Sequence, residues 1–277
     1  MLVYLNGEFV PHAEARVSVD DRGFLLADGV YEVIRVYRGR PFLMPEHLCR
    51  LAGGLLALEI RYDGIQELQD AAIRLIQENG LDGDATIYLQ ITRGAAPRTH
   101  AFPPEGTPPT VYAAARPFQP QPETYFEDGV ACITTPDTRW ARCDIKSIAL
   151  LPNVLANQKA KASGAFEAIF VRDGIALEGS HSNLFAVFEG TIVTYPRNNY
   201  ILPGITRERA LRIASEQGIP AREEPIPLDR LYEADELFLS GTTTEIMPVT
   251  SVDGRPIGDG RPGPVTRRIL DAYRAAT

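Results

Sequence analysis

The sequence predicts two α/β domains whose strands pair in mixed or antiparallel fashion. Its 277 residues are enough for one large domain or for two medium ones with hydrophobic cores of their own. Segments that indicate hairpins outnumber strand–helix–strand units, which favours antiparallel pairing. The proline-rich segment QPQPET, residues 119–124, interrupts this pattern. We therefore predict an N-terminal domain over residues 1–118, a linker over 119–124 and a C-terminal domain over 125–277.

The N-terminal domain is expected to open with two hairpins, followed by two helices and two strands. LVYLNGEFV should turn at Asn6, and YEVIRVYRGRPFL near Gly39. One helix should start at Pro45, although two adjacent glycines weaken that prediction, and the next should end at Gly80. ATIYLQITRG and PTVYAAARPF are then expected as strands, with a long proline-rich loop between them.

The C-terminal domain is expected to combine strands with three helices. A strand, VACITTP, precedes a helix, NVLANQKAKASG, and two strand pairs follow, FEAIFVRDGIALEG and NLFAVFEGTIVTY. GITRERALRIASEQG is a clear helix, with Thr206 near its start and Gly218 after its end. ELFLSGTTTEIMPV should be a strand that enters a threonine-rich turn, and PVTRRILDAYRAAT should be the last helix.

Composition argues against several classes of protein. The net charge of −8 and the pI near 5.1 disfavour a surface for nucleic acid or for anionic membranes. No apolar run approaches the roughly 20 residues that span a bilayer, and the start of the chain lacks the basic region of a signal peptide. Three scattered cysteines are too few for a disulfide framework or a zinc site. We therefore expect a cytoplasmic protein without a metal centre.

Lysine is scarce in this chain, and the scarcity makes one lysine a candidate catalytic residue. Only three of the 28 basic side chains are lysines: Lys146, Lys159 and Lys161. Arginine cannot supply a deprotonable amine, which is the group that attacks a carbonyl or moves a proton. Lys146 lies in an apolar run, where partial desolvation would favour the neutral amine. The alternative is an ordinary solvated lysine.

Three further segments have two interpretations each. Glu178, in LEGSHSN, is either a carboxylate directed into a cleft from the end of a strand or part of a polar turn. LPGITRE enters a helix through Gly204, so the N–H groups of Ile205 and Thr206 could bind a phosphate or could belong to an ordinary helix start. The hydroxyls of SGTTTE, residues 240–245, are either a second phosphate contact or a turn.

A pair of basic side chains lies in the proline-rich loop. Arg98 and His100 are two residues apart, and alternate side chains of an extended segment face the same way. The two could therefore bind one carboxylate together. A solvated loop is the alternative interpretation.

Seven segments occur in one order across almost the whole chain: DRGFLLADGVYEV, EHLCRL, TRGAAPRTHAF, RWARCDIKSIALLPNVLANQKA, LEGSHSNLF, ILPGITRE and SGTTTEIMPV. This ordered set closely resembles the fold-type IV aminotransferases that depend on pyridoxal 5′-phosphate, and among them the D-amino-acid aminotransferases. The resemblance implies two α/β domains with the cofactor cleft between them. It also implies amino-acid and 2-oxo-acid substrates, with no nucleic acid and no membrane as partners.

The resemblance also implies roles for individual residues. Lys146 would be the Schiff-base lysine, and Glu178 would pair with the protonated ring nitrogen of the cofactor. Tyr31, Arg98 and His100 match the residues that bind the substrate α-carboxylate in the D-specific members. There the arginine and histidine come from the neighbouring subunit, which implies a homodimer with shared active sites. The remaining implied cofactor contacts are Leu202 on one face of the ring, and Arg50, Ile205, Thr206 and Thr242 at the phosphate.

The implied reaction is transfer of the amino group of D-amino acids, of the D-alanine and D-glutamate type, to 2-oxo acids such as 2-oxoglutarate or pyruvate. Alternatives on the same scaffold are a branched-chain L-amino-acid aminotransferase, a 4-amino-4-deoxychorismate lyase and an R-selective amine transaminase. A non-catalytic protein that binds pyridoxal phosphate is the alternative from another class. Three positions that bear on cofactor affinity depart from the family pattern, namely His181, Pro203 and Gly241.

Overall fold

The computed structural model describes residues Met1–Thr277 and divides them into two compact units. The first unit contains Met1–Pro120 together with Ile145–Ala149, and the second contains Gln121–Asp144 together with Leu150–Thr277. The division after Pro120 falls inside the segment expected as a linker. The Ile145–Ala149 segment, which carries Lys146, belongs to the first unit although the sequence places it well inside the predicted C-terminal domain.

The first unit is built on a six-stranded sheet in the order β2-β1-β6-β5-β3-β4, and neighbouring strands are antiparallel. The turn between β1 and β2 has the positive φ angles of Asn6 and Gly7 that its Asn-Gly pair predicts. The elements are β1 (Leu2–Leu5), β2 (Glu8–Pro11), α1 (Arg22–Leu26), β3 (Gly29–Tyr37), β4 (Arg40–Pro41), α2 (Met44–Ala57), α3 (Ile65–Glu78), β5 (Ala85–Thr92) and β6 (Thr110–Pro117).

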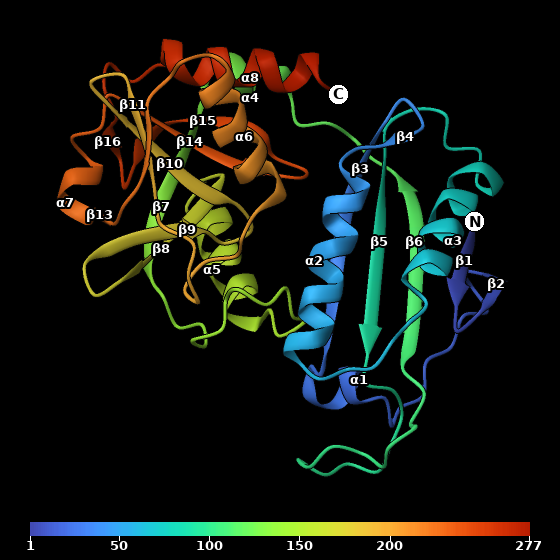
Figure 1. The fold of residues 1–277 in the computed structure, drawn as a ribbon. Coiled ribbons are helices and arrows are strands. Elements are labelled where there is room, and N and C mark those ends of the chain that lie inside the picture. The colour runs from blue at the N-terminus through green and yellow to red at the C-terminus, as the bar shows by residue number, and fades with distance from the viewer. The chain divides into compact units, whose positions relative to one another are not determined.

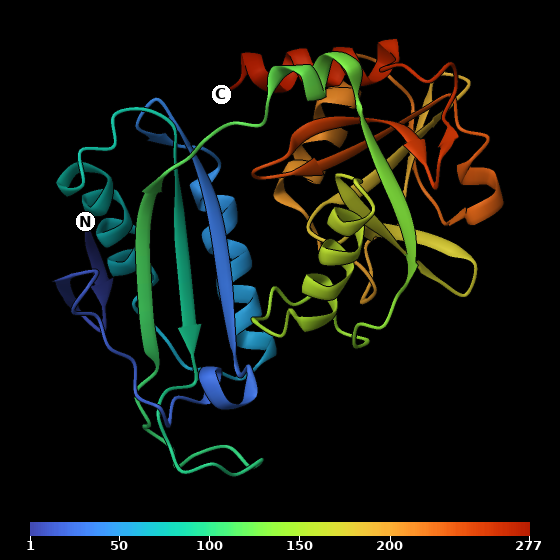
Figure 2. The ribbon, with the colours of Figure 1, turned by 180° about the vertical axis from the view of Figure 1, so that it is seen from behind.

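Helices α2 and α3 pack on one face of this sheet and leave the other face uncovered except near the end of β5, where the short helix α1 lies against Thr92 (Figures 1 and 2). Strand alternation explains the division: Ile87 and Leu89 of β5 are buried in the core under the helices, whereas Tyr88 points to the other face. Gly54 lets α2 approach β3 closely, because a Cβ there would lie 3.1 Å from Val30 Cγ1. Gly54, one of the two glycines that weaken the helix prediction, is therefore needed for the close packing of α2 on β3.

The second unit is built on a mixed ten-stranded sheet in the order β12-β11-β10-β14-β15-β7-β8-β9-β13, with β16 beside β15. An additional pairing joins β9 to β10 at Glu178 and Asn183, which closes β10, β14, β15, β7, β8 and β9 into a ring. The strands are β7 (Val130–Pro136), β8 (Glu167–Arg172), β9 (Ile175–Gly179), β10 (Asn183–Phe188), β11 (Thr191–Thr194), β12 (Ala221–Glu223), β13 (Ile226–Pro227), β14 (Glu236–Gly241), β15 (Glu245–Val252) and β16 (Arg255–Pro256).

The three helices predicted for this part of the chain are present. They are α5 (Leu151–Ala162), α6 (Ile205–Glu216) and α8 (Pro264–Ala275). Two short helices were not predicted, α4 (Glu123–Asp128), which begins inside the expected linker, and α7 (Leu228–Leu231). None of the helices in the structure combines the length and the apolar character needed to cross a membrane.

Candidate active site

Backbone pairing fixes Lys146 beside the first residues of β3. The N–H of Tyr31 donates to the carbonyl of Lys146 at 3.0 Å, and the N–H of Ile148 donates to the carbonyl of Gly29 at 3.1 Å. The side chain of Lys146 is half-buried, and its Nζ lies 3.4 Å from Tyr31 Oη and 4.4 Å from the centroid of the Tyr31 ring. The structure therefore brings together two of the residues that the sequence proposed for the site.

A buried carboxylate lies next to this lysine. Glu32 is fully buried, and Arg50 donates to its two oxygens at 2.7 and 2.9 Å, while His47 Nδ1 lies 2.8 Å from it. Burial alone would raise the pKa of Glu32, but the charge and hydrogen bonds of Arg50, with smaller contributions from His47 and Lys146, lower it to about 2. Burial also lowers the pKa of His47. Arg50, the expected phosphate arginine, is thus held in place by an ion pair that the sequence did not reveal.

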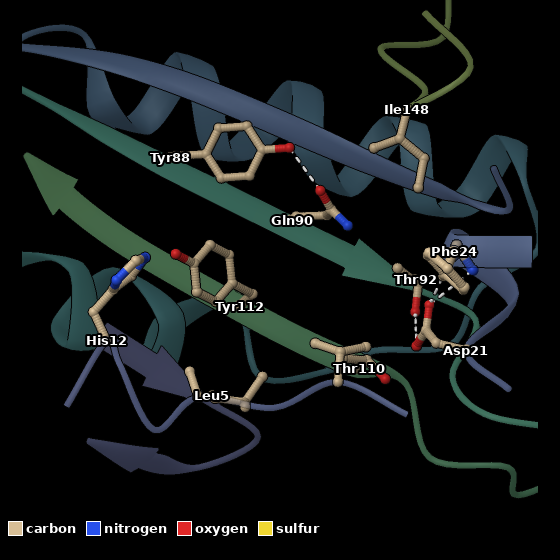
Figure 3. Close-up of a pocket in the computed structure, with 13 residues that line it drawn as sticks. Leu5, His12, Asp21, Phe24, Tyr88, Gln90, Thr92, Thr110, Tyr112 and Ile148 are labelled. Atoms are coloured by element: carbon tan, nitrogen blue, oxygen red, sulfur yellow. Dashed lines mark hydrogen bonds between the residues drawn. The ribbon is translucent and has the colours of Figure 1, made fainter. Parts of the chain in front are cut away.

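The face of the first sheet opposite α2 and α3 carries a cavity of about 690 Å³, lined in part by Phe24 of α1 (Figure 3). Tyr88, Gln90 and Tyr112 line it from neighbouring strands, and Ile148 lines it from the lysine segment. The ring of Tyr31 stacks on that of Tyr88 at 5.8 Å between centroids, so Tyr31 lies beside this lining. The cavity with its tyrosine side chains is therefore adjacent to Tyr31, the residue that contacts Lys146.

Arg98 and His100 lie apart from these groups. Both side chains are exposed, and neither has a hydrogen bond or ion pair within the chain. The segment bends at both residues, so the straight geometry assumed from the sequence is wrong. The structure of the single chain does not bring this pair to Tyr31.

In the second unit, Glu178 lies at the end of β9 and is only 4% exposed. Its carboxylate accepts hydrogen bonds from Arg139 Nη1, from Asn183 Nδ2 at 2.9 Å and from the N–H of Leu202 at 3.1 and 3.2 Å. Burial raises the pKa of Glu178 to about 7, and the charge and hydrogen bond of Arg139 oppose that rise. All three hydrogen-bond partners of Glu178 are donors, which favours the carboxylate over the neutral acid and so opposes the effect of burial.

Arg139 is itself locked by a second buried acid. Its Nε and Nη2 donate to the two oxygens of Asp137 at 2.9 and 3.1 Å, and Arg172 Nη2 lies 2.9 Å from the same carboxylate. The guanidinium of Arg139 also packs over the ring of Phe170, 4.2 Å from its centroid. Glu178 thus ends a row of alternating charges formed with Arg139, Asp137 and Arg172.

Asn183 ties Glu178 to the start of α6. Its Nδ2 also donates to the carbonyl of Leu202 at 2.9 Å. Its Oδ1 lies so close to Gly204 that a Cβ there would come within 1.9 Å of it, so only glycine fits at this position. Gly204 has no side chain to cap the helix, which leaves the N–H groups of Ile205 and Thr206 without a capping partner at the positive end of a 12-residue helix. This arrangement fits an anionic group such as a phosphate.

The threonine-rich turn between β14 and β15 lies near the turn that follows Glu178. A Cβ on Gly241 would be 3.6 Å from the carbonyl oxygen of His181, so the turn with Thr242 adjoins the one with His181. The buried carboxylate of Glu167 organises the latter turn, because it accepts hydrogen bonds from the N–H of His181 at 2.7 Å and from Ser182 Oγ at 2.9 Å. Glu178, Leu202 and the start of α6 therefore form one cluster, with Thr242 on the neighbouring turn.

Comparison with known proteins identifies the family of this chain. The family model for amino-transferase class IV matches residues 29–252. This chain belongs to the class IV aminotransferases. It is 43% identical over 273 residues to a protein of Staphylococcus aureus strain N315 named D-alanine aminotransferase, with 98% of this chain and 96% of that protein covered. A Bacillus licheniformis protein of the same name is 41% identical over 274 residues, covering 99% and 96%.

Solved structures give the same fold for this class IV aminotransferase. The branched-chain amino acid aminotransferase of Escherichia coli superposes with a TM-score of 0.92 at 33% identity, covering 99% of this chain and 93% of that one. The T.th. enzyme of that name, solved with pyridoxamine 5′-phosphate, gives a TM-score of 0.90 at 32% identity, covering 100% and 94%. The predicted fold class, aminotransferase activity and pyridoxal phosphate cofactor are confirmed.

Replacing Gly204 with alanine tests the junction between Asn183 and α6. The new Cβ would displace the Asn183 side chain from Glu178 and Leu202, and we expect a loss of about 1–3 kcal/mol in the free energy of unfolding together with weaker cofactor binding. Denaturant unfolding and titration of the apoprotein with pyridoxal phosphate measure the two effects. Gly53→Ala is the matched control, because a Cβ there meets nothing within 4 Å. Equal behaviour of the two variants would contradict the prediction.

Proposed function

We propose that this class IV aminotransferase moves the amino group of D-amino acids, of the D-alanine and D-glutamate type, to 2-oxo acids such as 2-oxoglutarate or pyruvate. The observation that carries the proposal is the 41–43% identity, over nearly the whole chain, to proteins named D-alanine aminotransferase. The site residues are consistent with it, since a lysine amine, a buried carboxylate and a helix start suited to phosphate are all present.

Lys146 has the central role in this proposal. Bound pyridoxal phosphate supplies an electron sink that makes the α-hydrogen of the amino acid acidic. The Nζ of Lys146 would take this proton from the substrate α-carbon as a base and would give it up again as an acid. Tyr31 Oη, 3.4 Å from Nζ, orients the amine and limits its motion. Acid and base catalysis then depend on one side chain in two protonation states.

The second unit would serve the ring and the phosphate. Glu178 would hold the ring nitrogen of the cofactor, and its carboxylate would keep that nitrogen protonated and the ring an electron sink. Leu202 would supply an apolar contact to the ring. The phosphate is assigned to the N–H groups of Ile205 and Thr206, to Thr242 and to Arg50.

Recognition of the substrate α-carboxylate is assigned to Tyr31, Arg98 and His100. Because Arg98 and His100 are exposed and have no partner on their own chain, we propose that they act on a second copy, so that the enzyme works as a homodimer. Light scattering should then give twice the chain mass of 30.5 kDa. The cytoplasm remains the predicted compartment.

A branched-chain L-amino-acid aminotransferase is the second candidate, favoured by the names of the structural neighbours. Mixing the cofactor-loaded protein separately with D-alanine and with L-leucine distinguishes the two. We expect D-alanine alone to bleach the visible absorbance of the bound cofactor. With the carboxylate held at its site, only one enantiomer would direct its α-hydrogen toward Lys146. Bleaching by L-leucine alone would overturn the D-specific assignment in favour of the second candidate.

A further inference from the structure

The loop that carries Arg98 and His100 is anchored from beneath by one buried arginine. Arg22 Nη1 donates to the carbonyl oxygens of Thr99 and Ala101 at 2.8 and 3.2 Å, so the main chain is held on both sides of His100. Arg22 is only 3% exposed, whereas the side chains of Arg98 and His100 are exposed. The anchored carbonyls and the exposed basic side chains therefore belong to the same short segment.

Arg22 is in turn fixed by a largely buried ion-pair triad with Asp28 and Arg93. Asp28 accepts hydrogen bonds from Arg22 Nε at 2.8 Å and from Arg93 Nε and Nη2 at 2.8 and 3.0 Å. Burial alone would raise the pKa of Asp28, but the hydrogen bonds and charges of Arg93 and Arg22 lower it below its usual value. The three side chains are therefore charged, and the planar guanidinium groups of Arg22 and Arg93 fix the directions of their hydrogen bonds to Asp28.

Arg93 extends the anchor at both ends. It donates to the carbonyls of Leu58 and Glu59, just after α2, at 2.6 and 2.9 Å. On the other side, its guanidinium lies 3.7 Å from the centroid of the Phe102 ring, which is 55% exposed. A loop rich in proline and glycine is therefore tied to the end of a helix through two buried arginines and the partly buried Asp28.

We propose that the Arg22–Asp28–Arg93 triad positions the loop that presents Arg98 and His100, and thereby sets the affinity of the enzyme for the α-carboxylate of its substrates. The inference rests on the proposed function, in which Arg98 and His100 bind that carboxylate. Arg22 does not touch the substrate; it is a positioning residue. Lysine could not replace it, because a single ammonium group cannot place donors at the separate positions of Nε and Nη1, which bind Asp28 and the two carbonyls.

The test is a KM measurement on the cofactor-loaded enzyme with D-alanine and 2-oxoglutarate. In Arg22→Met the loop loses both carbonyl anchors, and a misplacement of this kind costs between about 10- and 100-fold in the use of a substrate. We expect the KM values of both substrates to rise by that factor, because both carry the carboxylate, while the cofactor absorbance and kcat at saturation change little. Arg16→Met is the matched control, since exposed Arg16 also donates to two carbonyls, at 2.7 and 2.9 Å, but outside this loop.

Coupling to Arg98 separates positioning from general stability. If Arg22 acts through Arg98, Arg22→Met should raise KM far less in an Arg98→Met background than in the wild type. Phe102→Ala removes an exposed ring without opening the core, and we expect a rise in KM of about threefold. This milder variant tests the anchor even if Arg22→Met fails to fold.

The outcomes distinguish this inference from the proposed function. Additive effects of the Arg22 and Arg98 substitutions, or unchanged KM values in both Arg22→Met and Phe102→Ala, would overturn the positioning role alone. An Arg98→Met variant with unchanged KM would instead overturn the assignment of the carboxylate site, and the inference with it. Equal KM increases in Arg16→Met and Arg22→Met would reject the anchor as the cause.

Discussion

Replacing Lys146 with alanine is expected to abolish transamination, with a fall in turnover of about 10⁴-fold or more. Under the proposed function, the variant loses both the amine that would hold the cofactor and the base that would move the α-proton; Lys146 is the only lysine of the first unit. Steady-state rates with D-alanine and 2-oxoglutarate, together with the visible absorbance of the bound cofactor, measure the effect.

Lys161→Ala serves as the control for Lys146→Ala, because the side chain of Lys161 is exposed and makes no hydrogen bond or ion pair in the structure. Its turnover should match that of the wild type. Added small primary amines, such as methylamine, should restore part of the lost rate in Lys146→Ala if the missing group is a base. Steady-state transamination retained in Lys146→Ala without added amine would refute the assignment.

Glu178→Gln is expected to lower kcat by about 10²- to 10³-fold, because a neutral amide no longer stabilises a protonated ring nitrogen. The substitution also turns an acceptor into a partial donor among Arg139, Asn183 and the N–H of Leu202, all of which donate to Glu178. Glu233→Gln, at an exposed position of the same unit, is the control. A Glu178→Gln enzyme with a normal kcat would remove Glu178 from the mechanism.

The same residue predicts a pH dependence of cofactor binding. Burial, partly offset by Arg139, raises the pKa of Glu178 to about 7, so the apoprotein carries a neutral acid below that pH and a carboxylate above it. In the proposed complex, Glu178 and the ring nitrogen would share one proton, so binding below pH 7 would have to release the extra proton. Affinity for pyridoxal phosphate should therefore fall as the pH drops from 7 to 5, approaching about tenfold per unit. Titrations of wild type and Glu178→Gln, subtracted from each other, isolate this effect; identical pH profiles would contradict it.

Elements with strong local patterns were predictable from the sequence alone. The apolar spacing in α3 and the Asn-Gly turn after β1 depend on neighbouring residues, and the structure has both. The same is true of α6, whose entry through Gly204 lies in a contiguous motif. The identities of Lys146 and Glu178 as site candidates also came from local features, a scarce residue type and an acid at a strand end.

Partners that lie far away in the sequence were not predictable. Arg139 reaches Glu178 across 39 residues, and Arg22 reaches Ala101 across 79, and neither pairing leaves a periodic or compositional signal. Glu32 was hidden for a different reason, because an acid inside a β-branched strand gives no hint that His47 and Arg50 of the following helix will satisfy it. Such partners become visible only when the chain is folded.

The Ile145–Ala149 segment has a consequence for how the chain folds during synthesis. β4 pairs with β3 only at Val36 and Tyr37, so the edge of β3 at Gly29–Tyr31 is covered by residues 146–148 instead. The first 120 residues leave the ribosome well before this cover exists, and until then that strand edge is an unpaired template for other chains. The nascent chain thus depends on the arrival of the segment that carries Lys146, the proposed catalytic lysine, to cover this part of the strand edge and protect it from aggregation.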